Sequence, residues 1–234
     1  MKKQYGFTLP ELIISYLLGM IVIAATLSIY VTTVVSGTDA VLSARLNHDL
    51  ESIMILMAYD IKRAGYWGEA DSGTDAVNNP FTTATTDIQI LSGGSCIRYT
   101  YDADEDGVVD GNEYYGFSLD GNIAKMRSST TDTTTGQCPS TGWGSLNESA
   151  TVDITALSFN ADDSKCINMD ADPPASYDSP CADLDAADYD SGDRLVEQRV
   201  INITLTGRLD DDTAVERTLQ ETVMVRNNGV YLAP

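Results

Sequence analysis

The sequence predicts an α+β fold, in which one long N-terminal helix packs on a head of antiparallel β-sheet. Three observations lead to this prediction. An uncharged apolar run lies near the N-terminus, a pattern with helical spacing follows it, and short strand-like segments fill the chain beyond residue 85. The 43% of hydrophobic residues among 234 is enough for a core, so a disordered chain is excluded.

The apolar run has no charged residue from Leu12 to Thr38. It exceeds the roughly 20 residues that a helix needs to cross a bilayer. Lys2 and Lys3 precede it and are expected to stay in the cytoplasm, which leaves the bulk of the chain outside. A signal peptide would have a shorter apolar core and a small-residue cleavage site after it. A simple signal anchor does not account for Glu11, because a carboxylate is costly in lipid and usually functional there.

The segment GFTLPELI, which starts at Gly6 and follows a short basic leader, resembles the processing motif of type IV prepilins and type II secretion pseudopilins. The resemblance implies that the prepilin peptidase cuts between Gly6 and Phe7 and that Phe7 is then N-methylated. It also implies that Glu11 pairs with the N-terminal amine of a neighbouring subunit, since a carboxylate among apolar helices needs a positive partner. Pro10 departs from the commoner apolar residue but lies in the first helical turn, where its missing N–H costs nothing.

Helical spacing continues beyond the apolar run. Apolar residues recur at steps of three and four, at Val41, Leu42, Leu46, Leu50, Ile53, Met57, Ile61 and Ala64. We therefore expect one helix from about Pro10 to Ala64 that stops near Gly65. The predicted divisions are a cleaved leader (1–6), a membrane-spanning or filament-core half of the helix (7–38), an amphipathic half (39–64) and a β-rich head (65–234).

Two further segments resemble known pilins. DIKRAGYWG (60–68) is similar to the end of the long helix in PilW-type minor pilins and J-type pseudopilins, and TLQETVMVRN (218–227) resembles the last strand of the J-type group. The resemblance implies a pilin-like fold. Tyr66 and Trp67 are expected to fill the junction between helix and sheet.

The head is expected to be built from short strands separated by Gly, Asp and Asn. The candidate strands are 87–91, 96–101, 113–119, 123–128, 151–160, 198–209 and 215–227, and the last two form a long hairpin around DDDT. Residues 129–147 and 161–194 are predicted to be Ser/Thr-rich or Asp-rich loops.

Twelve residues, DADEDGVVDGNE, match an EF-hand calcium loop at every position. The predicted ligands are Asp102, Asp104, Asp106, the Val108 carbonyl, Asp110 and Glu113, with Gly107 at the sharp turn. An ordinary acidic turn requires neither that glycine nor a glutamate at the twelfth place. Because both flanks resemble strands, calcium is expected to hold a β-connection rather than a sensor's helix pair. A second acidic cluster, 183–193, lacks the pattern and is predicted to be a solvated loop, with a second metal left open.

The four cysteines, Cys96, Cys138, Cys166 and Cys181, form no CxxC pair, and His48 is the single histidine, so a zinc site is poorly supported. Four cysteines allow three disulfide pairings. Cys166 and Cys181 bracket a short Pro- and Asp-rich stretch, which favours their pairing and leaves Cys96 with Cys138. Disulfides persist in oxidising compartments, in agreement with export.

The net charge of −21 would repel phosphates, so no nucleic-acid partner is expected. The sequence contains no nucleophile elbow and no phosphate loop, and nothing in it places two carboxylates around a cleft. An enzyme is therefore not predicted. The protein is predicted to function as a PilW-type minor pilin. Its predicted partners are other minor pilins, the major pilin and the prepilin peptidase. It would reside in the bacterial inner membrane with its head in the periplasm, and then on the pilus or cell surface. A J-type pseudopilin of type II secretion is the nearest alternative, and a calcium-dependent tip adhesin presenting 129–137 and 183–193 is another.

Overall fold

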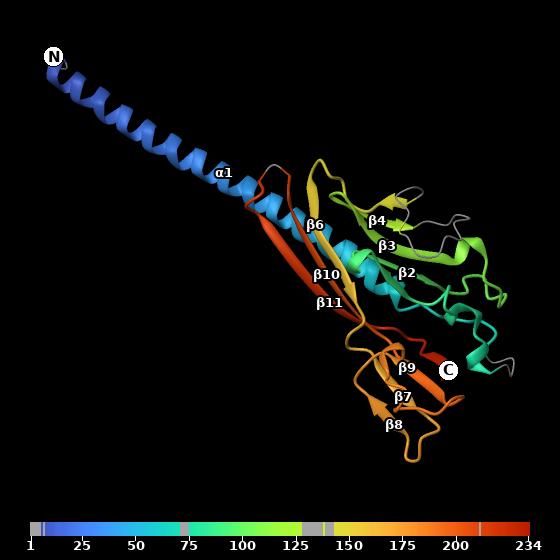
Figure 1. Ribbon diagram of the computed structural model, residues 1–234. Coiled ribbons are helices and arrows are strands. Elements are labelled where there is room, and N and C mark those ends of the chain that lie inside the picture. The colour runs from blue at the N-terminus through green and yellow to red at the C-terminus, as the bar shows by residue number, and fades with distance from the viewer. Residues whose placement is uncertain (1–5, 7, 71–74, 128–137, 139–142, 211) are drawn as a thin grey trace. The chain divides into compact units, whose positions relative to one another are not determined.

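One helix of 53 residues, α1 (Leu9–Ile61), begins the computed structural model, which describes residues 6, 8–70, 75–127, 138, 143–210 and 212–234. The chain divides into two compact units, residues 1–45 and 46–234. The helix passes from the first unit into the second. The long helix and the antiparallel head confirm the predicted α+β fold (Figure 1).

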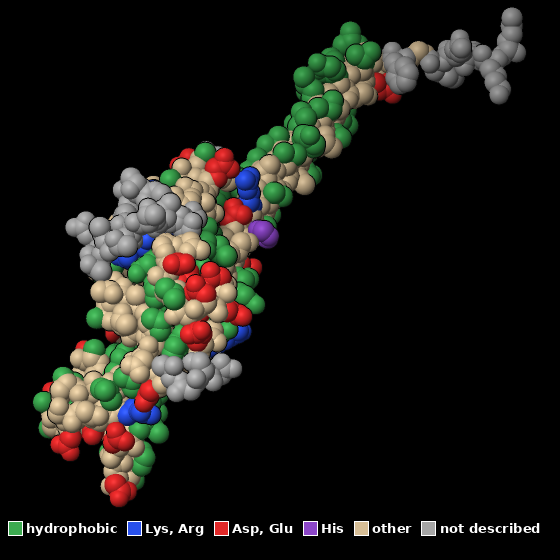
Figure 2. Space-filling view, turned by 90° about the vertical axis from the view of Figure 1, so that its right-hand side faces the viewer, with side chains coloured by type: hydrophobic (Ala, Val, Ile, Leu, Met, Phe, Trp, Pro, Cys, Tyr) green, Lys and Arg blue, Asp and Glu red, His purple; other side chains and the backbone are tan. Residues whose placement is uncertain are grey.

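The first unit is an apolar helical segment. It is long and apolar enough to cross a membrane, and its most apolar window has no buried residue. Figure 2 shows hydrophobic side chains along its surface. Its threonines donate to carbonyls one turn earlier, as Thr26 does to Val22 (2.9 Å) and Thr33 to Ile29 (2.8 Å). The polar side chains are thereby satisfied inside the helix, as an apolar environment requires.

The second unit starts with the rest of α1, whose buried face carries the predicted stripe. Buried side chains on this face are Leu46, Leu50, Ile53, Met54, Met57, Ala58 and Ile61. Val41 was predicted to belong to the stripe but is 69% exposed in the first unit, so this part of the prediction is wrong. The regular helix ends at Ile61, and turns lead to Gly65, whose φ of 71° favours glycine.

Three antiparallel sheets form the head. The first has the order β1 (Gln89–Leu91), β2 (Cys96–Thr100), β3 (Tyr114–Asp120), β4 (Ile123–Arg127) and β5 (Trp143–Ser145). The second has the order β11 (Glu216–Met224), β10 (Val200–Leu209) and β6 (Val152–Asn160). The third has the order β12 (Gly229–Leu232), β9 (Arg194–Gln198), β7 (Lys165–Asn168) and β8 (Ala175–Tyr177). Short 3-10 helices connect them at Ala76–Asn78, Pro80–Thr82, Ser92–Gly94, Gly111–Glu113 and Cys181–Asp183.

The predicted strands are found, but the predicted loops are not all loops. The long hairpin is β10 paired with β11, from Val200 opposite Met224 to Arg208 opposite Glu216. However, β5 lies in the region 129–147, and β7 and β8 lie in 161–194. β12 also follows the segment predicted to be the last strand. These strands have three or four residues each, too short for an alternating pattern to stand out among Asp, Ser and Pro.

The helix packs on the second sheet. Along β10 every second residue is buried, including Ile201, Ile203 and Leu205. Gly207 continues this row, and a Cβ there would lie 2.7 Å from Cδ2 of Leu50. The missing side chain therefore lets α1 approach β10 closely. Such interdigitated apolar contacts are the main source of stability in a core of this kind.

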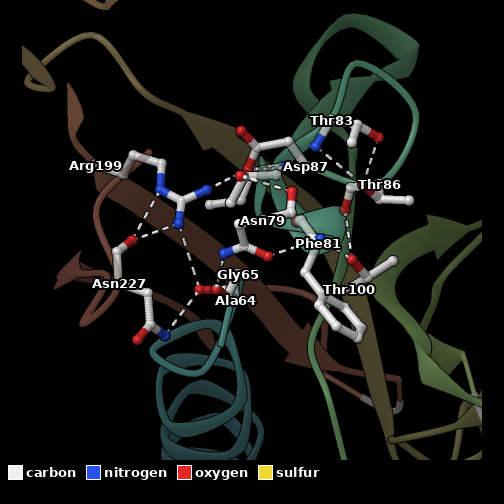
Figure 3. Close-up of polar contacts among 12 residues, drawn as sticks. Ala64, Gly65, Asn79, Phe81, Thr83, Thr86, Asp87, Thr100, Arg199 and Asn227 are labelled. Carbon is white, nitrogen blue, oxygen red and sulfur yellow. Dashed lines mark hydrogen bonds and ion pairs between the residues drawn. The ribbon is translucent and has the colours of Figure 1, made fainter. Parts of the chain in front are cut away.

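The turns that follow α1 are held by side chains from distant segments (Figure 3). Nδ2 of Asn227 donates to the carbonyls of Arg63 (3.3 Å) and Ala64 (3.1 Å), and Nδ2 of Asn79 donates to that of Gly65 (3.0 Å). These turns are thus fixed by two residues that lie far apart in the sequence: Asn79 precedes the first sheet, and Asn227 follows the last strand of the second.

Candidate functional site

The predicted calcium loop connects the two central strands of the first sheet. Thr100 pairs with Tyr114 and Cys96 with Ser118, so β2 and β3 form a hairpin that residues 101–113 close. The prediction that strands rather than helices flank the loop is confirmed. Anything that orders this loop also fixes the register of the hairpin.

Three of the predicted ligands converge. Carboxylate oxygens of Asp102, Asp104 and Asp106 lie within 4.8 Å of one another. Asp102 is 1% exposed, and its Oδ2 accepts from the backbone N–H groups of Gly68 (2.9 Å) and Gly107 (3.0 Å). Its Oδ1 is buried without a hydrogen-bond partner among the described residues. A buried carboxylate oxygen without a partner is costly, and a cation beside it would remove that cost.

The sharp turn of the loop requires glycine. Gly107 has a φ of 77°, and a Cβ there would lie 2.6 Å from Oε2 of Glu69. Next to it, the backbone N–H of Val108 donates to Oδ1 of Asp106 (2.8 Å). The sixth position therefore has the conformation that an EF-type loop needs.

The twelfth residue closes the loop from inside. Glu113 is fully buried, and its Oε1 accepts from the N–H of Ala103 (2.6 Å) while Oε2 accepts from that of Asp110 (2.9 Å). Asp110 and Glu113 lie outside the group of three converging carboxylates. Each oxygen of Glu113 keeps a second lone pair, so these bonds do not prevent it from binding a cation.

The loop also docks on the segment that follows the helix. The N–H of Asp102 donates to the carbonyl of Tyr66 (3.0 Å), and the Tyr66 hydroxyl donates to Oε1 of Glu105 (3.2 Å). A Cβ on Gly68 would lie 2.9 Å from Cα of Glu105, so glycine is needed for this approach. Trp67 is buried, whereas Tyr66 lies at the edge of the junction. The docking was not predicted from the sequence, in which the glycines at 68 and 107 were the signal that could have indicated it.

The second acidic segment, 183–193, is organised around an amide. Asn168 is 1% exposed, and its Nδ2 donates to Oδ2 of Asp193 (2.8 Å) and to the carbonyl of Asp188 (3.3 Å). Oδ2 of Asp193 also accepts from the N–H of Asp190 (2.9 Å). The described residues of this segment form no group of converging carboxylates.

The structure pairs Cys166 with Cys181 and Cys96 with Cys138, the two disulfides that the sequence favoured. The first bridge joins β7 to the Cys181–Asp183 helix. Beside this bridge, Cys166 and Leu195 belong to a small apolar cluster of the third sheet. The second bridge starts at the first residue of β2.

A buried carboxylate near the end of α1 ties the helix to the first sheet. Asp60 is 8% exposed and accepts from the hydroxyls of Tyr99 (2.6 Å) and Tyr101 (3.2 Å). Burial, followed by the charge of Asp60, raises the pKa of Tyr99 well above its usual value, so the hydroxyl stays a donor. The Arg63 guanidinium lies 4.0 Å from the centre of the Tyr101 ring.

At the start of α1, Glu11 lies in the first turn. Its Oε2 accepts from the N–H (3.1 Å) and the hydroxyl (2.8 Å) of Thr8, so it caps the helix as the glutamate of a capping box does. Gly6 is exposed, with no atom within 4 Å of where a Cβ would stand. Phe7 lies outside the described residues.

An exposed apolar N-terminal helix that continues into an antiparallel head defines a pilin-like protein. The model of one family, described as prepilin peptidase-dependent protein B, matches residues 39–225, and the chain belongs to this family. The family supports processing by the prepilin peptidase and, together with the apolar helix, fits membrane anchoring. It also suggests a structural protein rather than an enzyme. No curated protein and no solved structure matches the chain significantly.

Proposed function

We propose that the protein is a minor pilin that assembles with other minor pilins and the major pilin to prime or cap a type IV pilus. The observation that supports this is the motif from Gly6 to Glu11 at the start of an apolar helix with no buried residue in its most apolar window. Such a surface needs lipid before assembly and other helices after it. The head then lies in the periplasm and later on the pilus or cell surface.

Processing is tested at Gly6. Gly6→Leu fills the space at the predicted cleavage point, and we expect the full-length precursor to accumulate without N-methylation at Phe7. Intact mass spectrometry of the membrane fraction measures both, and Gly19→Leu, inside the apolar helix, is the control for hydrophobicity. A mature mass in the Gly6 variant would contradict the proposed processing.

Assembly is tested at Glu11. Glu11→Gln keeps the acceptor for Thr8 but removes the charge that would attract a neighbouring amine. We expect cleavage and membrane insertion to persist while incorporation into sheared filaments falls at least about tenfold, on the scale of a lost charge pair. Incorporation at the wild-type level would refute the pairing role.

Deletion of the gene separates a pilus from a secretion system. Loss of piliation and twitching with normal exoprotein release supports the minor pilin. The reverse result supports the J-type pseudopilin, which residues 60–68 and 218–227 also resemble.

We also propose that residues 102–113 bind one calcium ion as a structural clamp, with ligands from Asp102, Asp104, Asp106, the Val108 carbonyl, Asp110 and Glu113. The buried, unpartnered Oδ1 of Asp102 beside two further carboxylates is the observation that supports this. Calcium is a hard cation that accepts such oxygen ligands, and it would neutralise the mutual repulsion of the carboxylates.

Calcium binding is measured by calorimetric titration of the full chain in nanodiscs. The variant Asp102→Asn/Glu113→Gln keeps the shape and the acceptors of the loop hydrogen bonds but loses two anionic ligands, so we expect binding to disappear. Asp183→Asn/Asp185→Asn makes the same charge change in the second acidic segment and should bind as the wild type does. Equal loss in both variants would show non-specific attraction to an acidic protein.

A further inference from the structure

A cleft of about 800 Å³ opens where the first, second and third sheets meet. Its walls come from β1, β9, β10, β12 and the Cys181–Asp183 helix. This volume lies in the range of small-ligand sites. The cleft lies away from residues 102–113, none of which contributes to its lining.

Most of the wall is apolar. Ile88, Ile90, Leu195, Ile201 and Leu232 line it, and they are supplied by segments that are far apart in the sequence. An aliphatic chain of a few carbons would be accepted by these side chains, with a gain of about 0.8 kcal/mol for each buried methylene.

Three carboxylates and one guanidinium also line the cleft: Asp87, Asp183, Glu197 and Arg199. Arg199 is 3% exposed and forms an ion pair with Asp87 (Figure 3). Its remaining N–H groups donate to the carbonyls of Asn227 and Ala64. Asp87 also accepts from the Tyr231 hydroxyl (2.6 Å). These two charges therefore neutralise each other and hold the helix end.

Of the two carboxylates outside this pair, Asp183 is exposed and Glu197 is partly buried. It lies on β9, opposite Gly229 on one side and Cys166 on the other, in the middle of the third sheet. Burial and the neighbouring charge of Asp87 raise its pKa, and its interactions with Tyr231, Arg199 and the Cys181 backbone oppose this only in part. An anionic group in such surroundings gains most from a cation that enters beside it.

We propose that this cleft binds an alkylammonium group, whose charge pairs with Glu197 and whose stem packs on the isoleucine and leucine side chains. Two sources offer this chemistry: a lysine side chain of a neighbouring pilin subunit, or a free aliphatic amine. The combination of an apolar stem with a compact cationic head is what both have in common. The site is separate from the calcium loop, and its lysine source rests on the assembly with other pilins proposed above.

The test uses butylammonium chloride as the probe, titrated at pH 7 into the full chain in nanodiscs and followed by saturation-transfer NMR. We expect saturable binding and at least about tenfold weaker binding of 1-butanol, which has the stem without the charge, and of tetramethylammonium, which has the charge without the stem. Equal binding of 1-butanol, or no saturation with butylammonium, would overturn the proposal.

Two variants separate the site from the net charge. Glu197→Gln should weaken butylammonium binding at least about tenfold while the melting temperature is kept. Glu221→Gln removes the same charge from the exposed β11 and should bind as the wild type does. Equal weakening in both variants would show that butylammonium is attracted by the net charge of −21 in general, and it would refute a specific site in the cleft.

Zero-length carbodiimide cross-linking of the native membrane complex distinguishes the two sources. An amide between Glu197 and a lysine of a neighbouring subunit, found by mass spectrometry and absent in Glu197→Gln, assigns the ammonium group to that lysine. Saturable butylammonium binding without such a cross-link assigns it to a free amine.

Discussion

The two acidic loops of the head have similar compositions but different internal bonding. In residues 102–113 the carboxylates of Asp102, Asp104 and Asp106 converge, and one buried oxygen has no hydrogen-bond partner among the described residues. In residues 183–193 the carboxylate of Asp193 is bonded to an amide and to a backbone N–H. The comparison shows that two loops of similar acidic composition can arrange their carboxylates differently. The cation site is proposed for the first loop because there the backbone brings the oxygens together and leaves one of them unsatisfied.

The largest effect is expected at Asp102. Asp102→Ala should lower the free energy of unfolding by about 3 kcal/mol in saturating calcium, because the stabilisation by a ligand at 100 to 1,000 times its Kd is lost. That corresponds to a fall in Tm of about 10 °C for a chain of this size. Calorimetry in calcium and in chelator measures it, and Asp183→Ala should show no calcium-dependent change. Equal melting of wild type and Asp102→Ala in calcium would remove the distinction between the loops.

Asn168→Ala should destabilise the protein by about 2 kcal/mol, since the buried amide that bonds to residues on both sides is lost. The amide oxygen of Asn168 also accepts from the N–H of Asp170 (3.0 Å) and Ala171 (3.2 Å). The loss should be the same with and without calcium, because the second loop is held by the amide. Denaturant unfolding measures this, with the exposed Asn78→Ala as the control. A loss that calcium reverses would instead indicate a metal in the second loop.

Each loop has one glycine with positive φ, and these form a matched pair. Gly192→Ala (φ 91°) meets no atom within 4 Å, so only backbone strain of about 1 kcal/mol is expected. Gly107→Ala adds a contact with Glu69 and should cost about 2 kcal/mol. The double variant Gly107→Ala/Glu69→Ala should recover the difference, measured by chemical denaturation. Equal losses for the two single variants would show that the docking of the first loop does not constrain Gly107.

The smallest effect concerns pH. Hydrogen bonds from Asp190 and then Asn168 lower the pKa of Asp193 below its ordinary value of 3.8. A carboxyl whose folded pKa is depressed stabilises the protein above its unfolded pKa, and this is lost as the pH falls through the folded value. We expect Asp193→Asn to lower stability slightly at neutral pH and to leave it unchanged at the acid end, which flattens the acid limb below pH 3.8. Urea titrations between pH 2 and 5 test this, and an unchanged acid limb would contradict it.

The elements with a long regular pattern were predictable. The helix has its apolar spacing, β6, β10 and β11 alternate over nine or ten residues, and the motif of the loop between β2 and β3 is contiguous. Local patterns of this length specify the element without reference to the rest of the chain. The same holds for Gly107, whose place in the motif requires its conformation.

The third sheet and the buried charges were not predictable. β7, β8 and β12 are too short for a pattern, and they form a sheet only because β9 lies between β12 and β7. Asp60 and Arg199 look like surface residues in the sequence, because their partners, Tyr99 and Asp87, lie 39 and 112 residues away. The cleft beside Glu197 depends on the same distant contacts.

The bonds from Asn227 to the turn after α1 have a consequence for the order of folding. The bond from Asn227 to the Arg63 carbonyl joins residues 164 positions apart. Contacts of such high sequence separation form late, because the intervening chain must first be ordered. We therefore expect the turn after α1 to lack this bond until the chain as far as Asn227 is available. In the proposed periplasmic location, a head stalled earlier in export would present an unfinished turn there, which a chaperone or protease could recognise.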